Sequence, residues 1–153
     1  VSWAAERGSE RIMRMLLDRS DVNPNTADEN GRTSLSWAVG EEAGGAMRML
    51  LDRSNVNPNI ADEGGPTPLL RAAANRREEV VRMLLHRSDV NPNIADENGR
   101  TPLSWAVRCG REMFVEMLLE RSDTHPKRAD IHGCTPLFIA FANKHVEVAK
   151  LLL

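Results

Sequence analysis

The sequence predicts an all-α solenoid of short helix-turn-helix units joined by loops with tight turns. Residues 87–107 reappear as residues 19–39 with only two changes, 68 positions away, and weaker copies at 53–73 and 121–141 set the step at 34 residues. Leucine pairs keep the same step at 16–17, 50–51, 84–85, 118–119 and 152–153. A fixed period between 20 and 50 residues is typical of stacked repeats, in which each unit contacts mainly its neighbours.

Each copy is predicted to hold two helices. Thr33, Thr67, Thr101 and Thr135 can cap the first helix through their hydroxyl groups. Proline follows three of them, at the first helical position, where its missing N–H has no intrahelical partner to lose. We expect first helices at 34–40, 68–75, 102–109 and 136–143, with residues 1–5 as part of another. Second helices are expected at 10–18, 45–52, 78–86, 112–120 and 146–153. Alanine at 4, 38, 72, 106 and 140 should let the first helices approach closely.

The loops carry their own signals. Asn30-Gly31 predicts a two-residue type I′ turn, with positive φ at both central positions. Asn23, Asn57 and Asn91 recur in the longer loop, with His125 in the fourth slot, and we expect a ladder that hydrogen-bonds the neighbouring loop. The second copy reads as the weakest, because glycines in residues 41–46 should delay its second helix.

Composition restricts the function. The net charge of −2 and pI near 6.1 predict no general attraction to nucleic acid or anionic membrane. Cys109 and Cys134 do not follow the repeat, and neither a signal peptide nor a membrane-length apolar run is present. We therefore expect an intracellular location, cytoplasmic or nuclear, for a chain that begins and ends inside a repeat.

The motif Gly-Arg-Thr-Pro-Leu-Ser-Trp-Ala at 99–106, the Leu-Leu second helix at 115–119 and the Asp-Val-Asn loop at 89–91 resemble the ankyrin repeat. The resemblance covers the whole chain and divides it into a partial repeat at 1–27, full repeats at 28–61, 62–95 and 96–129, and a partial repeat at 130–153. The step of 34 rather than 33, serine at the ends of the second helices, and Ser36 and Ser104 in place of histidine depart from the family pattern. This variant is similar to ankyrin arrays of fungal proteins, which are often joined to nucleotide-binding switch domains.

The resemblance implies a concave face that binds another protein through turn tips and exposed parts of the first helices. Carried onto this chain, the turn positions are Glu29, Asn30, Arg32, Glu63, Pro66, Glu97, Asn98, Arg100, Ile131 and His132. The helix positions are Arg71, Ala74, Asn75 and Arg108.

Two residue columns bear on that face. Trp3, Trp37 and Trp105 share one helix position, which indicates packing between repeats, and Arg71 takes the slot in the third copy. With Arg76, Arg77 and Arg108 it forms a basic cluster that is either a contact patch or a solvated face.

Arginines at 19, 53, 87 and 121 should complement the helix dipole at the ends of the second helices, on a charge-balanced surface; a phosphate-binding surface is the alternative.

No catalytic or metal motif stands out. His125, His132 and Cys134 match no ligand spacing known for zinc, and the serines have no histidine in phase. We expect a non-catalytic module without cofactors that binds another protein, as a recognition or regulatory array in a larger protein. The alternatives are a structural spacer that associates end to end through uncapped terminal repeats, and the sensor segment of a larger nucleotide-dependent switch enzyme.

Overall fold

The computed structural model describes residues 1–40 and 44–153, and these residues form helices and loops without a β-strand. The first helix of each pair is α1 (Ser2–Glu6), α3 (Ser34–Gly40), α5 (Pro68–Ala74), α7 (Pro102–Arg108) or α9 (Pro136–Ala142). The second is α2 (Glu10–Leu17), α4 (Gly44–Leu51), α6 (Glu78–His86), α8 (Glu112–Leu119) or α10 (Val146–Leu151). The predicted all-α solenoid is confirmed.

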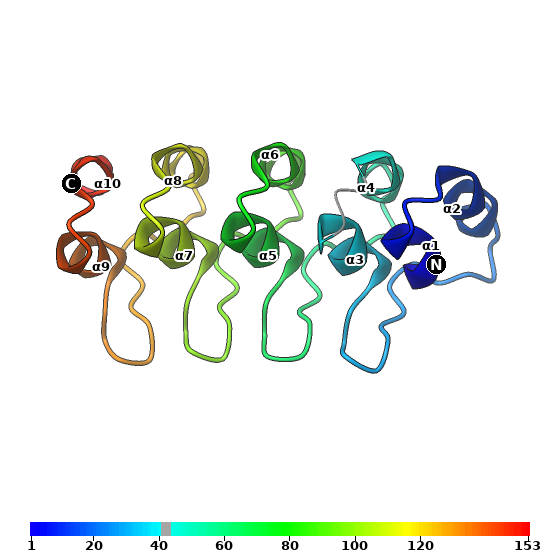
Figure 1. Ribbon diagram of the computed structural model, residues 1–153, viewed down its shortest axis with the longest axis horizontal. Coiled ribbons are helices and arrows are strands. Elements are labelled where there is room, and N and C mark those ends of the chain that lie inside the picture. Colours follow the sequence, from blue (N-terminus) through cyan, green and yellow to red (C-terminus); the bar gives the residue numbers. More distant parts are fainter. Residues whose placement is uncertain (41–43) are drawn as a thin grey trace.

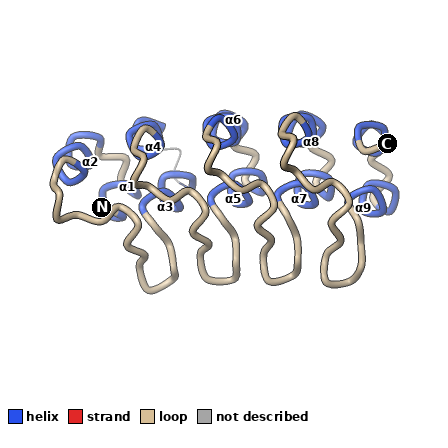
Figure 2. Tube along the Cα trace, turned by 180° about the vertical axis from the view of Figure 1, so that it is seen from behind, coloured by secondary structure: helices blue, strands red, loops and turns tan. Residues whose placement is uncertain are grey.

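The helix pairs stand side by side in a single row, in the order of the chain (Figure 1). The first helices form one layer and the second helices form another, while the long loops project from the opposite side of the first layer. The same two layers and projecting loops appear from behind (Figure 2). The core runs between the layers along the whole row, because each pair buries its apolar stripe against its neighbours.

The first helices begin and pack as their sequence indicates. The hydroxyl groups of Thr67, Thr101 and Thr135 each accept a hydrogen bond from the backbone N–H three residues later, at 3.2–3.3 Å, with proline in the first turn. The alanine column is fully buried: Ala4, Ala38, Ala72, Ala106 and Ala140 are each at most 1% exposed. The small side chain at this position is therefore enclosed within the hydrophobic core.

Two expectations about the second copy and the turns are wrong. Helix α4 begins at Gly44, the position equivalent to the start of α6, so it is not delayed; residues 41–43 of the same expectation lie outside the described residues. In the Asn30-Gly31 turn only Gly31 has a positive φ, +71°. The N–H of Gly31 donates to the carbonyl of Asp28, and the turn is a type I turn followed by a left-handed glycine rather than type I′.

The loop ladder exists, but a different asparagine builds it. The side-chain N–H of Asn59 donates to the backbone carbonyl of Asp89 at 2.7 Å. The side-chain oxygen of Asn59 accepts from the backbone N–H of Asn91 at 2.8 Å. Asn25 and Asn93 make the same pair of bonds to the following loop, the latter with the N–H of His125. The predicted residues Asn23, Asn57 and Asn91 instead accept from an N–H two residues later in their own loop. The first asparagine shapes each loop and the second joins it to the next.

The arginine column also joins copies. The guanidinium group of Arg87 donates to the carbonyls of Leu51, Arg53 and Val56 in the preceding copy, at 2.9–3.1 Å, and pairs with Asp89. Arg121 repeats this arrangement one step later. The sequence predicted that these arginines complement the ends of their own second helices on a solvated surface. They instead complement the end of the second helix in the preceding copy, and their side chains are mostly buried.

Candidate functional site

The projecting turns and the first-layer helices form one continuous side of the molecule, which we call the turn face. It comprises residues 28–32, 62–66, 96–100 and 130–134 together with the exposed side chains of α3, α5, α7 and α9. Each turn is anchored by an aspartate at its first position: Asp28, Asp62, Asp96 and Asp130. Consecutive turns pack tightly, since a Cβ added to Gly31 or Gly99 would lie 2.9 Å or less from the backbone of the next turn.

In the second copy, residues 28–61, and the fourth copy, residues 96–129, both oxygens of the turn aspartate accept hydrogen bonds. Oδ1 of Asp28 accepts the N–H groups of Asn30 and Arg32, at 2.9 and 3.0 Å, and Oδ2 accepts the indole N–H of Trp37 at 2.9 Å. Asp96 holds its own turn and Trp105 in the same way. The tryptophan column thus fixes each helix to its turn.

An arginine from each of these turns lies over the tryptophan ring. The guanidinium carbon of Arg32 is 4.8 Å from the ring centre of Trp37, and that of Arg100 is 4.6 Å from Trp105. A cation at this distance over an indole ring is attracted to it. The two stacks fill the space at the base of their turns.

The third copy, residues 62–95, lacks these contacts between aspartate, tryptophan and arginine. Gly64 has a φ of +86°, the value that a type II turn requires at its third position, so the peptide before it is flipped relative to the equivalent peptide at Asn30. Pro66 stands where the flanking copies have arginine, and proline has no N–H. Oδ1 of Asp62 consequently has no hydrogen-bond partner, although the side chain is only 2% exposed.

Arg71 replaces the tryptophan of the flanking copies and pairs with Oδ2 of Asp62. No ring fills the base of this turn, and no arginine reaches over it from Pro66. The turn-to-turn bond is also interrupted here: the N–H of Glu63 donates to Asn30, and that of Ile131 to Asn98, but no bond joins Glu97 to Gly64 in the described part of the chain.

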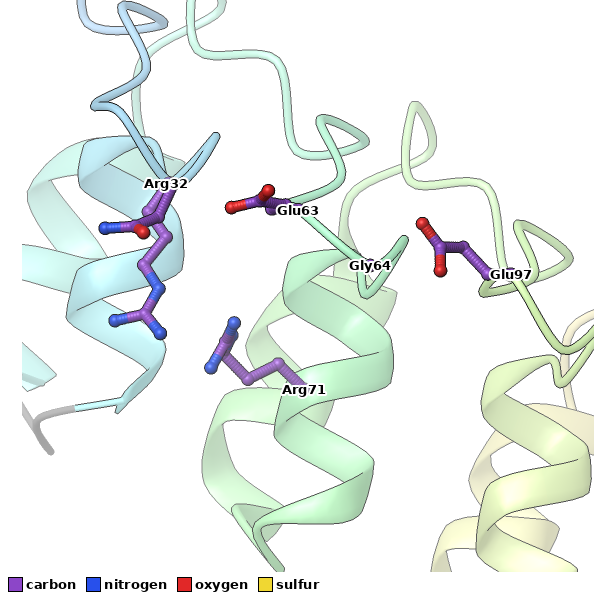
Figure 3. Close-up of a pocket in the computed structure, with 6 residues that line it drawn as sticks. Arg32, Glu63, Gly64, Arg71 and Glu97 are labelled. Atoms are coloured by element: carbon purple, nitrogen blue, oxygen red, sulfur yellow. The ribbon is translucent and has the colours of Figure 1, made fainter.

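These changes leave a polar hollow of about 400 Å³ at the middle of the turn face, which we call the notch. It is lined by Asn30, Arg32, Glu63, Gly64, Arg71 and Glu97. Figure 3 shows Arg32 and Arg71 pointing toward one another, while Glu63 and Glu97 extend from adjacent turns on either side of Gly64. The notch offers two guanidinium groups and two carboxylates to a visiting side chain.

Three of the turn aspartates, Asp28, Asp96 and Asp130, have a lowered pKa. Burial raises the pKa of Asp96, but hydrogen bonds from the backbone of Arg100 and the indole of Trp105 outweigh it and hold the pKa below the ordinary 3.8. The same balance lowers the pKa of Asp28. For Asp130 the backbone N–H of Cys134 is the main cause of a lowered pKa. The turn face is therefore densely charged at neutral pH.

The structure brings five of the fourteen residues predicted from the sequence into the notch: Asn30, Arg32, Glu63, Arg71 and Glu97. Glu29, Pro66, Asn98, Arg100, Ile131 and His132 lie on the turns outside it, and Ala74, Asn75 and Arg108 lie at the far ends of α5 and α7. In the predicted basic cluster Arg71 is paired with Asp62 and Arg77 donates to the carbonyl of Gly40, whereas Arg76 and Arg108 are exposed, so a contact patch there stays a prediction.

Sequence reasoning overlooked the aspartates that anchor the turns. Their signal was present, because Asp28, Asp62, Asp96 and Asp130 keep the 34-residue step. The flipped peptide at Gly64 depends on the φ of that residue and could be recognised only in the structure.

Within the described ranges, 1–40 and 44–153, no three His, Cys, Asp or Glu side chains lie close enough together to hold a metal ion. In the same ranges no helix has the length and hydrophobicity that crossing a membrane requires.

Comparison with known proteins identifies the repeat. A family model described as ankyrin repeats, three copies, matches residues 1–96, 42–130 and 88–153, which together span the chain. A comparison with curated proteins finds no match. The matched segments contain the helix pairs, the capped first helices and the projecting turns described above. The chain belongs to the ankyrin-repeat family.

Proposed function

We propose that this chain is a non-catalytic recognition array that binds another protein through its turn face, with the notch as the centre of the contact. Ankyrin repeats generally mediate protein–protein interaction and are typically non-catalytic. The helix pairs are joined from copy to copy by hydrogen bonds and form a rigid support. The turn residues can vary on this support without disturbing the stack.

The observation that carries the proposal is the notch itself. The second and fourth copies have nearly identical turns, and each fills the base of its turn with a tryptophan and an arginine. The third copy, between them, departs from both at the three positions that open the hollow, and it leaves a buried carboxylate oxygen unbonded. Places where a sequence breaks its own local rules are often functional sites.

A second function has some support. Apolar side chains are exposed at both ends of the row: Trp3 is 60% exposed at one end, and Phe141 is 61% exposed at the other. Burying such surfaces against another copy would favour end-to-end association. Sedimentation of the array over a range of concentrations measures this directly, and a mass that stays monomeric would count against it.

The test of the proposed function uses a variant in which Gly64→Asn, Pro66→Arg and Arg71→Trp give the third copy the residues of its neighbours. We call it the notch-filled variant. Both arrays, confirmed folded by circular dichroism, serve as baits for proteins in a lysate of the source organism. A protein retained by the wild-type array and lost by the notch-filled variant is the expected result.

The matched control is Arg82→Ala, an exposed change on α6 in the other layer, which should retain the same proteins as the wild type. If the notch-filled variant and the control retain identical sets, the notch is not the contact. If the wild-type array retains nothing above an empty bait, the end-to-end function becomes the better account.

A further inference from the structure

The partner's chemistry can be inferred from the charges of the turn face, on the condition that the proposed function holds. The turn face carries seven carboxylates and four arginines, which give it a net charge of −3. The whole chain has a net charge of −2, so this face is more negative than the molecule as a whole. The carboxylates are Asp28, Glu29, Asp62, Glu63, Asp96, Glu97 and Asp130, and the arginines are Arg32, Arg71, Arg100 and Arg108. A partner complementary to this surface is cationic.

The arginines are largely engaged by the protein itself. Arg71 pairs with Asp62, Arg100 pairs with Asp96 at 2.8 Å, and Arg32 lies over Trp37. Glu29, Glu63 and Glu97 are exposed and have no ion pair in the part of the chain that the structure describes. Arg108, at the far end of α7, is exposed and has no ion pair in the described residues. The free charges at the turn tips themselves are therefore a row of glutamates, one on each of three consecutive turns.

Asp62, whose partner Arg71 lines the notch, differs from the aspartates of the flanking turns. Oδ1 of Asp62 accepts nothing, whereas the same oxygen of Asp28 and of Asp96 accepts two backbone N–H groups. Its negative charge is thus compensated only through Arg71, which forms part of the notch lining. Of the charged groups that line the notch, Arg71 is already paired with Asp62, whereas Glu63 and Glu97 have no ion pair in the described part of the chain, so the unpaired carboxylates favour a cationic side chain.

The spacing of the row suggests the shape of the partner. Packed helices lie roughly 8–10 Å apart, so equivalent glutamates on adjacent copies are separated by about that distance. A peptide in the polyproline II conformation has three residues per turn and rises about 3.1 Å per residue, so side chains three residues apart lie on one side, about 9 Å from one another. In the fourth turn Ile131, 63% exposed, takes the glutamate position and ends the charged row.

We propose that the turn face binds an extended basic segment of a partner protein, with arginine or lysine at every third residue and the central cationic side chain in the notch. Each cation meets one glutamate of the row, and the register is set by the notch between two filled turns. An aliphatic residue three positions beyond the last cation would lie against Ile131.

The probe is a fluorescent nine-residue peptide of serine and glycine with arginines at positions two, five and eight. It is compared with a peptide of the same composition whose arginines are contiguous, and with one that carries glutamates instead. In low salt the spaced peptide should bind the wild-type array at least about five-fold more tightly than the contiguous one, because only the spaced peptide meets all three glutamates at once.

Glu63→Gln combined with Glu97→Gln should weaken binding of the spaced peptide about ten-fold, and Glu116→Gln on the exposed side of α8 should leave it unchanged. Equal binding of the two arginine peptides, preference for the glutamate peptide, or no effect of the double substitution would overturn the proposal. These outcomes differ from failure of the proposed function, in which the notch-filled variant retains every protein that the wild type retains.

Discussion

At the scale of single residues, the contacts between copies depend on side chains that bond to the backbone of a neighbour. Arg87 reaches three carbonyls of the preceding copy while Asp89 holds its guanidinium group in place. The last carbonyls of a helix have no partner within the helix, so an arginine from the next copy satisfies groups that would otherwise need water. The 34-residue column of arginines was visible in the sequence, but its acceptors lie 31 to 36 residues away and emerge only from the stacking.

Arg87→Ala should therefore destabilise the array by about 1–3 kcal/mol, because hydrogen bonds from a charged donor are lost together. Arg19 is the matched control, since it occupies the same column but bonds only to the side chain of Asp21. Arg19→Ala should cause no measurable change. Equal effects of the two substitutions in urea unfolding would show that the bonds between copies contribute nothing.

Asp28, Asp96 and Asp130 give stability a pH dependence whose sign follows from their lowered pKa. For Asp96 the folded pKa lies below the ordinary value of 3.8, so its stabilising contribution is complete above that value and is lost as pH falls through the folded pKa. Asp96→Asn should be less stable than the wild type at neutral pH. The gap should stay constant from neutral pH down to about 5 and narrow only as pH falls through and below 3.8, and a gap that stays constant there in thermal melts would contradict this assignment.

At the scale of the elements, the sequence determined nearly everything. The predicted first helix at 34–40 and second helix at 78–86 match α3 and α6, and every other predicted end lies within two residues of the observed one. Threonine caps, prolines in the first turn and apolar stripes are local signals that act within a few residues. Helix α4 shows their limit: its glycines predicted a late start, but packing against its neighbours overrides the low propensity.

The second helices should be held mainly by burial between copies. Leu84 in α6 is completely buried in the core, so Leu84→Ala should destabilise by about 2–5 kcal/mol in denaturant unfolding. Met113 in α8, 44% exposed, provides the control, and Met113→Ala should change stability by less than about 0.5 kcal/mol. A loss below about 1 kcal/mol at Leu84 would mean that this layer is not the core.

At the scale of the whole molecule, the repeat predicted the row of helix pairs, and the face that the family uses indicated where to look. It did not predict the notch. The substitution of Arg71 for tryptophan stood out in the sequence, but the effect of Gly64 and Pro66 on Asp62 depends on a peptide flip and a missing N–H that act together. Sequence reasoning read Arg71 as part of a basic patch, whereas its pairing with Asp62 makes it part of the notch lining.

We infer that the third copy gives up stabilising contacts to keep the notch open. The most direct measurement is the urea unfolding midpoint of the notch-filled variant against that of the wild type. Restoring two N–H donors to Asp62 and an indole at position 71 should raise the free energy of unfolding by about 1–3 kcal/mol, because a buried acceptor without a partner is destabilising by about that amount. An unchanged or lower midpoint would contradict the claim, since the residues of the third copy would then be as stable there as those of its neighbours.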